Sequence, residues 1–370
     1  MMKSVEVLFR PFESEKLNLK NRLVMAPMTR SFSPGHIANE QVAGYYRRRA
    51  EGGVGLIITE GTIVNHKGAN GYPNVPAIYG EKALAGWQQV VEQVHQAGAK
   101  IIPQLWHVGS VRRQGIGPDK QAPAYSPSGL YKPGKENGVA MTQQDINDVI
   151  AAFTQAAVDA QRIGFDGIEI HGAHGYLIDQ FLWEGTNQRT DKYGGSLVKR
   201  AQFAIELVQS VRKAVGDAFP IIFRFSQWKS QDYGAKLAKT PEELSTLVNL
   251  LADAGVDIFH ASTRRFWEPE FAGSDLNLAG WTQKLSGKPT ITVGSVGLDD
   301  DFLEDKGLAM SEQANISGID NLIERMQNHE FELAAVGRAI LVDAQWPNKV
   351  KNGELDSLKP YTKEALMSLS

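Results

Sequence analysis

The strongest constraint on the fold is a regular alternation of short apolar runs with longer helical patterns. Eight runs are almost continuously apolar, which is typical of strands buried on both faces of a parallel sheet. They cover residues 22–28, 55–60, 100–106, 167–171, 220–225, 256–261, 289–293 and 333–336. Apolar spacing and capping residues predict helices in the gaps, over residues 39–51, 81–97, 142–163, 197–215, 241–254 and 318–328.

This order predicts an α/β fold, and we expect a (β/α)8 TIM barrel as a single domain over residues 1–370. The alternative is an open, doubly wound sheet, which usually has fewer strands and a glycine-rich phosphate loop after the first. The chain contains neither GxGxxG nor GxxxxGK followed by Ser or Thr, so the barrel is favoured. Three stretches exceed a minimal barrel: a cap at its bottom (residues 1–20), a long loop after the third strand (109–141) and an acidic insert after the seventh (299–317).

The amino-acid composition excludes several kinds of site and partner. The chain has no cysteine, which excludes disulfides, thiolate-held iron–sulfur clusters, cysteine-ligated zinc and a cysteine nucleophile. Its formal net charge is −3, and no basic block indicates nucleic-acid binding. Without an apolar run behind the first residues or a stretch of about 18 apolar residues, we expect a cytoplasmic protein with no membrane segment.

Active sites of TIM barrels lie at the C-terminal ends of the strands, and strands seven and eight usually form a phosphate site there. Here these strands end in Gly294 and Gly337, and Arg338 follows at once. Glycines allow close approach of backbone N–H groups, and an arginine adds a fork of donors. The alternative is two glycines in ordinary turns and a surface arginine.

The pair His171 and His174, on the turn after strand four, has three readings. The two rings could donate hydrogen bonds to an oxyanion, ligate a metal, or be ordinary polar turn residues. No further ligand set stands at the other strand ends, and Tyr176 lies on the same turn, so we favour hydrogen-bond donors. A phenol with a pKa of about 10 is protonated at neutral pH and can act as a general acid.

Three more side chains lie at the expected mouth of the barrel. Gln104 and Arg224 offer several donors each, which suits a cofactor ring with carbonyls and ring nitrogens. Arg224 could instead form an ion pair inside the barrel, with Glu169 or Glu60 as its partner. Trp106 is expected to wall a substrate pocket or to belong to the core.

Five motifs match, in order, those of the old yellow enzyme family of FMN-dependent ene-reductases. They are residues 20–30 (KNRLVMAPMTR), 104–107 (QLWH), 171–177 (HGAHGYL), 187–196 (NQRTDKYGGS) and 337–338 (GR). The resemblance covers essentially the whole chain. It implies a set of FMN contacts, namely Pro27, Met28, Thr29, Gly61, Gln104, Arg224, Gly294, Ser295, Gly337 and Arg338.

The resemblance also implies a reaction. NADH or NADPH would reduce the FMN, and an activated alkene (an α,β-unsaturated carbonyl or nitro compound) would then bind with its oxygen on His171 and His174. Hydride from flavin N5 and a proton from Tyr176 would reduce the double bond, with Trp106 in the substrate site. The expected partners are therefore small molecules, with no metal and no nucleic acid, and the protein is expected to be a monomer or homodimer.

Two alternatives stay open: a flavin-binding redox sensor without an alkene substrate, and a cluster-free reductase of the dienoyl-CoA type. A non-flavin barrel, such as an aldolase or a metal hydrolase, lacks its Schiff-base lysine or ligand set here. The chain departs from the commonest family pattern in three places, which are Gln227 where proline is frequent, the aromatic segment 264–271 and the insert at 299–317.

Overall fold

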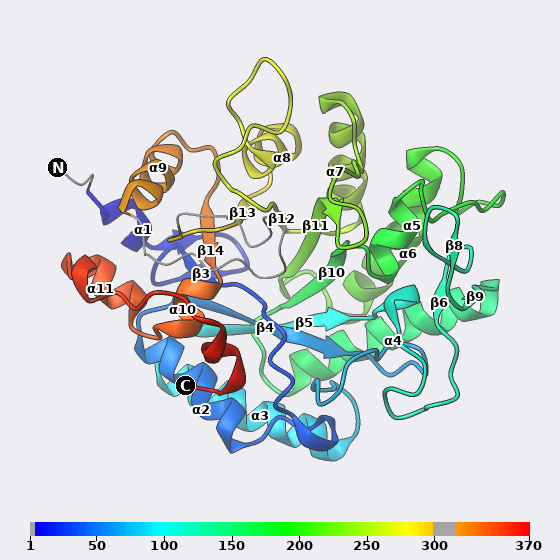
Figure 1. Ribbon diagram of the computed structural model, residues 1–370, viewed down its shortest axis with the longest axis horizontal. Helices are drawn as coiled ribbons and strands as arrows, with labels where there is room; N and C mark the ends of the chain where they lie inside the picture. The colour runs from blue at the N-terminus through cyan, green and yellow to red at the C-terminus, as the bar shows by residue number, and fades with distance from the viewer. Residues whose placement is uncertain (1–3, 299–315) are drawn as a thin grey trace.

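The computed structural model describes residues 4–298 and 316–370, and its centre is a closed barrel of parallel strands (Figure 1). The strands are β3 (Leu23–Met25), β4 (Leu56–Ile63), β5 (Lys100–Trp106), β10 (Ile168–His174), β11 (Ile221–Lys229), β12 (Ile258–Ser262), β13 (Thr290–Val293) and β14 (Leu333–Val336). They follow one another around the barrel in chain order, and β14 pairs with β3 to close it. The predicted TIM barrel is confirmed, and the open-sheet alternative is wrong.

Helices surround the barrel in Figure 1. The longer ones are α2 (Glu40–Glu51), α3 (Glu81–Gln96), α4 (Gln143–Arg162), α6 (Leu197–Val215), α7 (Pro241–Ala254), α8 (Leu278–Ser286) and α9 (Ile316–Gln327). All six predicted helices are present, and the ends agree within two residues. Thr142 opens α4 with a capping box to Asp145, as its sequence position indicates. The sequence did not predict α8, which is short and contains Gly280.

The N-terminal segment closes the bottom of the barrel, as expected. Strands β1 (Phe12–Glu13) and β2 (Asn18–Leu19) form an antiparallel hairpin. Phe12, Leu17 and Leu19 pack into the apolar cluster that fills the barrel interior. The hairpin therefore covers the end of the barrel opposite to the C-terminal strand ends, where TIM barrels place their active sites.

The long loop after β5 carries structure of its own. It contains the short strands β6 (Tyr125–Ser126), β7 (Leu130–Lys132), β8 (Lys135–Glu136) and β9 (Val139–Ala140), paired as β6 with β9 and β7 with β8. The acidic insert predicted at 299–317 falls mostly on residues 299–315, which lie outside the described residues. In the described part of the chain, no helix has both the length and the apolar character needed to cross a bilayer.

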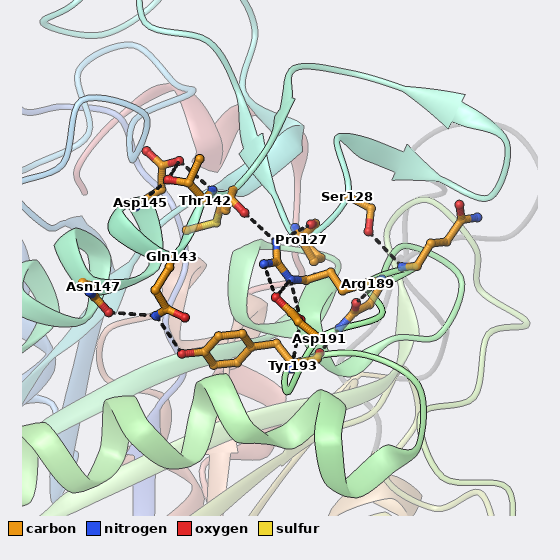
Figure 2. Close-up of polar contacts among 12 residues, drawn as sticks. Pro127, Ser128, Thr142, Gln143, Asp145, Asn147, Arg189, Asp191 and Tyr193 are labelled. Carbon is orange, nitrogen blue, oxygen red and sulfur yellow. Dashed lines mark hydrogen bonds and ion pairs between the residues drawn. The ribbon is translucent and has the colours of Figure 1, made fainter.

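The family motif at 187–196 braces this loop from outside the site (Figure 2). The Arg189 guanidinium points between Pro127 and Asp191; it donates to the Pro127 carbonyl oxygen at 3.0 Å and forms an ion pair with the Asp191 carboxylate. The Tyr193 hydroxyl accepts a hydrogen bond from the Gln143 amide on α4 at 3.0 Å. The motif therefore fixes the loop to α4 and contributes no side chain to the cavity described below.

Candidate active site

The two predicted histidines lie together at the C-terminal end of β10. His171 is buried, and His174, with a φ of 64°, begins the turn that follows. Their ring centroids are 5.2 Å apart and nearly perpendicular. The Nε2 atom of His174 lies 2.8 Å from the Ser262 hydroxyl at the end of β12, and the Trp228 ring stacks on the His174 ring at 4.5 Å. The His174 ring is thus fixed by contacts with β11 and β12.

Both histidines are neutral at neutral pH. Burial lowers the pKa of each well below its ordinary value, and the positive charge of Arg224 lowers it further. A neutral imidazole keeps one N–H donor. As for the metal reading, residues 4–298 and 316–370 contain no group of three or more His, Asp or Glu side chains that could hold an ion. The role of His171 and His174 as hydrogen-bond donors to a ligand stays a prediction.

Tyr176 lies against the same pair, with its ring centroid 5.1 Å from that of His171. Burial raises the pKa of its phenol well above 10, and the neighbouring phenol of Tyr72 adds to the shift. The two hydroxyl oxygens are 3.1 Å apart. Tyr176 is therefore a protonated phenol with a second phenol in hydrogen-bond contact, as a proton donor and its relay would require.

Trp106 supports both phenols. Its ring meets Tyr176 edge-to-face at 5.0 Å and stacks on Tyr72 at 5.2 Å. The indole is 2% exposed and rests on the backbone of Gly61, where an added Cβ would lie 2.3 Å from an indole carbon. Gly61 is thus required by Trp106 packing, a reason that the sequence did not reveal.

We expect Gly61→Ala to destabilise the protein by about 1–3 kcal/mol, because the added methyl group must displace Trp106. Displacement of the indole should also move the Tyr176 ring, so the near-ultraviolet circular dichroism of these aromatic rings should change together with stability. Urea unfolding measures the stability, and a circular dichroism spectrum of the folded protein measures the change in ring packing. Gly234→Ala is a control for glycine loss without a clash, since its φ is not left-handed and the nearest atom to an added Cβ is Asp232 Oδ1 at 3.5 Å. An unchanged stability of Gly61→Ala relative to this control would contradict the packing role.

Beside these rings a cavity of about 280 Å³ opens at the C-terminal ends of the strands. It brings together eight predicted residues: Pro27, Met28, His174, Arg224, Gly294, Ser295, Gly337 and Arg338. At one end an Nη2 atom of Arg338 lies 3.1 Å from the Ser295 hydroxyl. Gly294 has a φ of 143°, and a Cβ there would lie 2.7 Å from the Thr263 carbonyl oxygen, so only glycine fits.

A polar layer crosses the barrel interior next to this cavity. The Gln104 amide donates to Glu169 at 2.7 Å, and the other oxygen of Glu169 lies 2.6 Å from Nδ1 of His260. Arg224, the alternative partner of Glu169, instead bonds the Ser262 hydroxyl at 3.3 Å and has a buried Nε atom without a partner. Arg224 lines the cavity, so its guanidinium could serve a ligand with acceptor atoms.

These observations fit FMN. Donors for a phosphate lie at Ser295 and Arg338, and the guanidinium of Arg224 lies deeper, where a ring with carbonyl oxygens and ring nitrogens would need donors. Gly337 has room for a group above it, because the nearest atom to an added Cβ is Met28 Sδ at 3.6 Å.

The other six predicted residues are not among those that line the cavity. His171, Tyr176 and Trp106 form the group of rings beside it. Thr29 is exposed beyond β3, Gln104 is turned to Glu169, and Gly61 lies under Trp106. Sequence reasoning missed four side chains that the structure adds to the site: Tyr72, Trp228, Ser262 and Arg264. Ser262 ends strand six, so its position at a strand end was the available signal.

A second histidine pair, His66 and His107, follows strands β4 and β5, with ring nitrogens 2.9 Å apart. Burial lowers the pKa of His66 to about 4, and Lys67 adds to the shift. In the unfolded chain this histidine has an ordinary pKa of about 6.5. Between pH 6.5 and pH 4 it is therefore protonated in the unfolded chain but mostly neutral in the folded protein. Stability from this group is therefore full above about pH 6.5 and is lost as the pH falls toward 4.

We expect the wild type to lose about 2 kcal/mol more stability than His66→Gln between pH 7 and pH 5. Urea unfolding at both values measures it. The pKa of Glu60, which burial raises to about 7, has the opposite effect, since its folded form holds a proton longer. Glu60 is common to both proteins, so its effect cancels in the comparison. Equal losses in the two proteins would show that His66 titrates normally.

Known proteins resemble this chain over nearly its whole length. The model of the NADH:flavin oxidoreductase / NADH oxidase family matches residues 7–357. An NADH oxidase of Thermoanaerobacter brockii is 33% identical over 361 residues, which is 95% of this chain and 52% of that protein. 12-Oxophytodienoate reductase 7 of Oryza sativa subsp. japonica is 42% identical over 223 residues, 56% of each chain. The chain thus spans about half the length of these curated relatives.

Solved structures agree with this assignment. Morphinone reductase in complex with tetrahydroNAD aligns with a TM-score of 0.81 and 28% identity, over 97% of this chain and 93% of that one. The old yellow enzyme of Pichia sp. AKU4542 has the same TM-score and identity, over 97% and 89%. The chain therefore belongs to the old yellow enzyme / NADH:flavin oxidoreductase family.

Proposed function

We propose that this chain is an FMN-dependent ene-reductase that uses NADH or NADPH to reduce the C=C bond of activated alkenes. The observation that carries the proposal is that two neutral histidines and one protonated tyrosine lie together beside a cavity. The far end of this cavity has hydrogen-bond donors that could bind a phosphate. The family is FMN-dependent, and similar proteins named 12-oxophytodienoate reductase and morphinone reductase support a reductase.

Each side chain has a separate task in this proposal. FMN, when bound, supplies hydride transfer between the nicotinamide and the alkene. Gly294, Ser295, Gly337 and Arg338 would hold its phosphate, Arg224 would give a positive charge beside its ring, and Pro27, Met28, Thr29, Gly61 and Gln104 would contact or support the ring.

The histidines bind the substrate. His171 and His174 would donate N–H bonds to the carbonyl or nitro oxygen, where negative charge develops as the double bond is reduced. His174 would use Nδ1, because the Ser262 hydroxyl accepts from Arg224 and can donate its own hydrogen to Nε2. Because both rings are already fixed by Ser262, Trp228 and Tyr176, no reorganisation is needed when charge develops. Tyr176 would then give its proton to the α-carbon of the alkene.

The test uses the purified protein with FMN bound. We expect NADH or NADPH to bleach the flavin, 2-cyclohexenone to restore its colour without oxygen, and a phenol to give a long-wavelength charge-transfer band. A protein that takes up no FMN would refute the proposal. A flavin that is reduced but never reoxidised by alkenes would favour the redox sensor, and turnover restricted to dienoyl-CoA esters would favour the other reductase.

A further inference from the structure

Gln227 and the aromatic segment 264–271, two of the departures from the family pattern, contact each other in the structure. Gln227, on β11, accepts hydrogen bonds from the backbone N–H groups of Leu237 and Ala238 at 2.7 and 2.9 Å. Its amide nitrogen donates to Glu270 at 3.1 Å, and Glu270 also forms an ion pair with Lys236 at 2.6 Å. Gln227 thus ties the loop after β11 to the segment at 264–271.

A cleft of about 180 Å³ lies between these two loops. Its lining residues are Gln227, Trp228, Tyr233, Ala235, Lys236, Ser262, Thr263, Arg264, Arg265, Glu268, Pro269, Glu270 and Leu278. Four of them, Trp228, Ser262, Thr263 and Arg264, also line the larger cavity. The cleft is therefore an extension of the candidate active site, on the side of His174.

An aromatic wall leads from the site into the cleft. Trp228 stacks on His174, and the Tyr233 ring lies 5.9 Å from the Trp228 ring. Tyr233 is 45% exposed, and the Arg264 guanidinium lies 4.7 Å from its ring centre. Exposed aromatic rings beside a guanidinium offer stacking surface to a flat ring system.

Two arginines give the cleft side chains that can bind an anion. Arg264 and Arg265 line it together with Lys236, Glu268 and Glu270. Arg265 pairs with Glu268 at 2.9 Å, and because the Glu268 side chain is 52% exposed, this ion pair contributes little stability. A bidentate phosphate–arginine contact is the stronger alternative.

We propose that this cleft binds the phosphate-bearing end of the nicotinamide nucleotide while its nicotinamide lies beside His174. The inference rests on the proposed function. A dinucleotide has both parts that the cleft fits, a flat purine for Trp228 and Tyr233 and phosphates for Arg265 and Lys236. A small neutral enone needs only the oxygen contacts of His171 and His174 and has no phosphate for the cleft.

The test compares donors with and without phosphates on the FMN-loaded enzyme. Arg265→Gln should raise the half-saturating concentration of NADH or NADPH for flavin reduction by about tenfold, as loss of a charged phosphate contact implies. Reduction by 1-benzyl-1,4-dihydronicotinamide, which has no phosphate, should not change. Arg265→Lys should recover part of the loss. Calorimetric titration with ADP-ribose gives a binding measurement that is independent of turnover.

A matched control is Arg162→Gln, because Arg162 forms a similar exposed i,i+3 ion pair with Asp159 on α4, at 2.8 Å. It should behave as wild type with every donor. Equal loss with the phosphate-free donor, or unchanged binding of NADH, NADPH and ADP-ribose, would overturn the proposal. Loss confined to alkenes with an anionic tail would also overturn it, since the cleft would then serve the alkene. These outcomes depend on flavin reduction, so they can be read even if alkene reduction fails.

Discussion

Tyr176→Phe is expected to slow alkene reduction by about a hundredfold or more, while flavin reduction by nicotinamide nucleotide keeps its rate. The variant loses only the hydroxyl group, and its ring can still pack against Trp106 and His171. Since burial holds the phenol pKa well above 10, the wild-type group is protonated throughout the neutral range. The variant should therefore lose proton transfer to the alkene, while it still binds the flavin and the carbonyl or nitro oxygen of the substrate.

Anaerobic stopped-flow spectroscopy separates the two half-reactions. Tyr72→Phe is the matched control, since it removes the partner hydroxyl at 3.1 Å but leaves the acid in place. We expect a smaller loss there, confined to the alkene half-reaction. If Tyr176→Phe slowed both half-reactions equally, the role of Tyr176 would be in positioning the flavin or the loop, and not in proton transfer.

The barrel could be predicted from sequence because its strands are buried on both faces. Apolar runs such as Leu333–Val336 mark these strands, and all eight were found at the expected places. The grouping of His171, His174 and Tyr176 could also be predicted from sequence. These residues lie within six positions at the end of one strand, so local chain geometry alone brings them together.

Contacts between segments that are distant in the sequence could not be predicted in this way. Ser262 meets His174 from a strand 88 residues away, and Tyr72 meets Tyr176 from 104 residues away. No local periodicity encodes these pairs. Gln104 illustrates the same limit, since its residue type indicated a ring contact, while its amide is bonded to Glu169 inside the barrel.

The sequence also did not predict a buried ion pair that contacts the turn from His174 to Tyr176, for the same reason. The Lys229 ammonium, at the end of β11, lies 2.7 Å from the Asp179 carboxylate, and both side chains are fully buried. The other oxygen of Asp179 accepts the Gly175 N–H at 2.7 Å, within the turn from His174 to Tyr176. Burial raises the pKa of Asp179 and lowers that of Lys229, so each charge depends on the other.

Asp179→Ala is therefore expected to lower the free energy of unfolding by about 3–5 kcal/mol, because Lys229 would be left as a buried charge without its partner. The double variant Asp179→Leu with Lys229→Met should lose much less, since neither charge remains. Urea unfolding of the single and double variants gives the coupling. Glu184→Ala is the matched control: the Lys239–Glu184 pair has the same 2.7 Å separation, but its side chains are 61% and 55% exposed, so a loss below about 1 kcal/mol is expected. The turn from His174 to Tyr176 should also loosen in Asp179→Ala, so its phenol affinity should fall, which the surface variant should not show. A loss in Asp179→Ala no larger than that in Glu184→Ala would mean that Lys229 is neutral, or hydrated, in the folded protein.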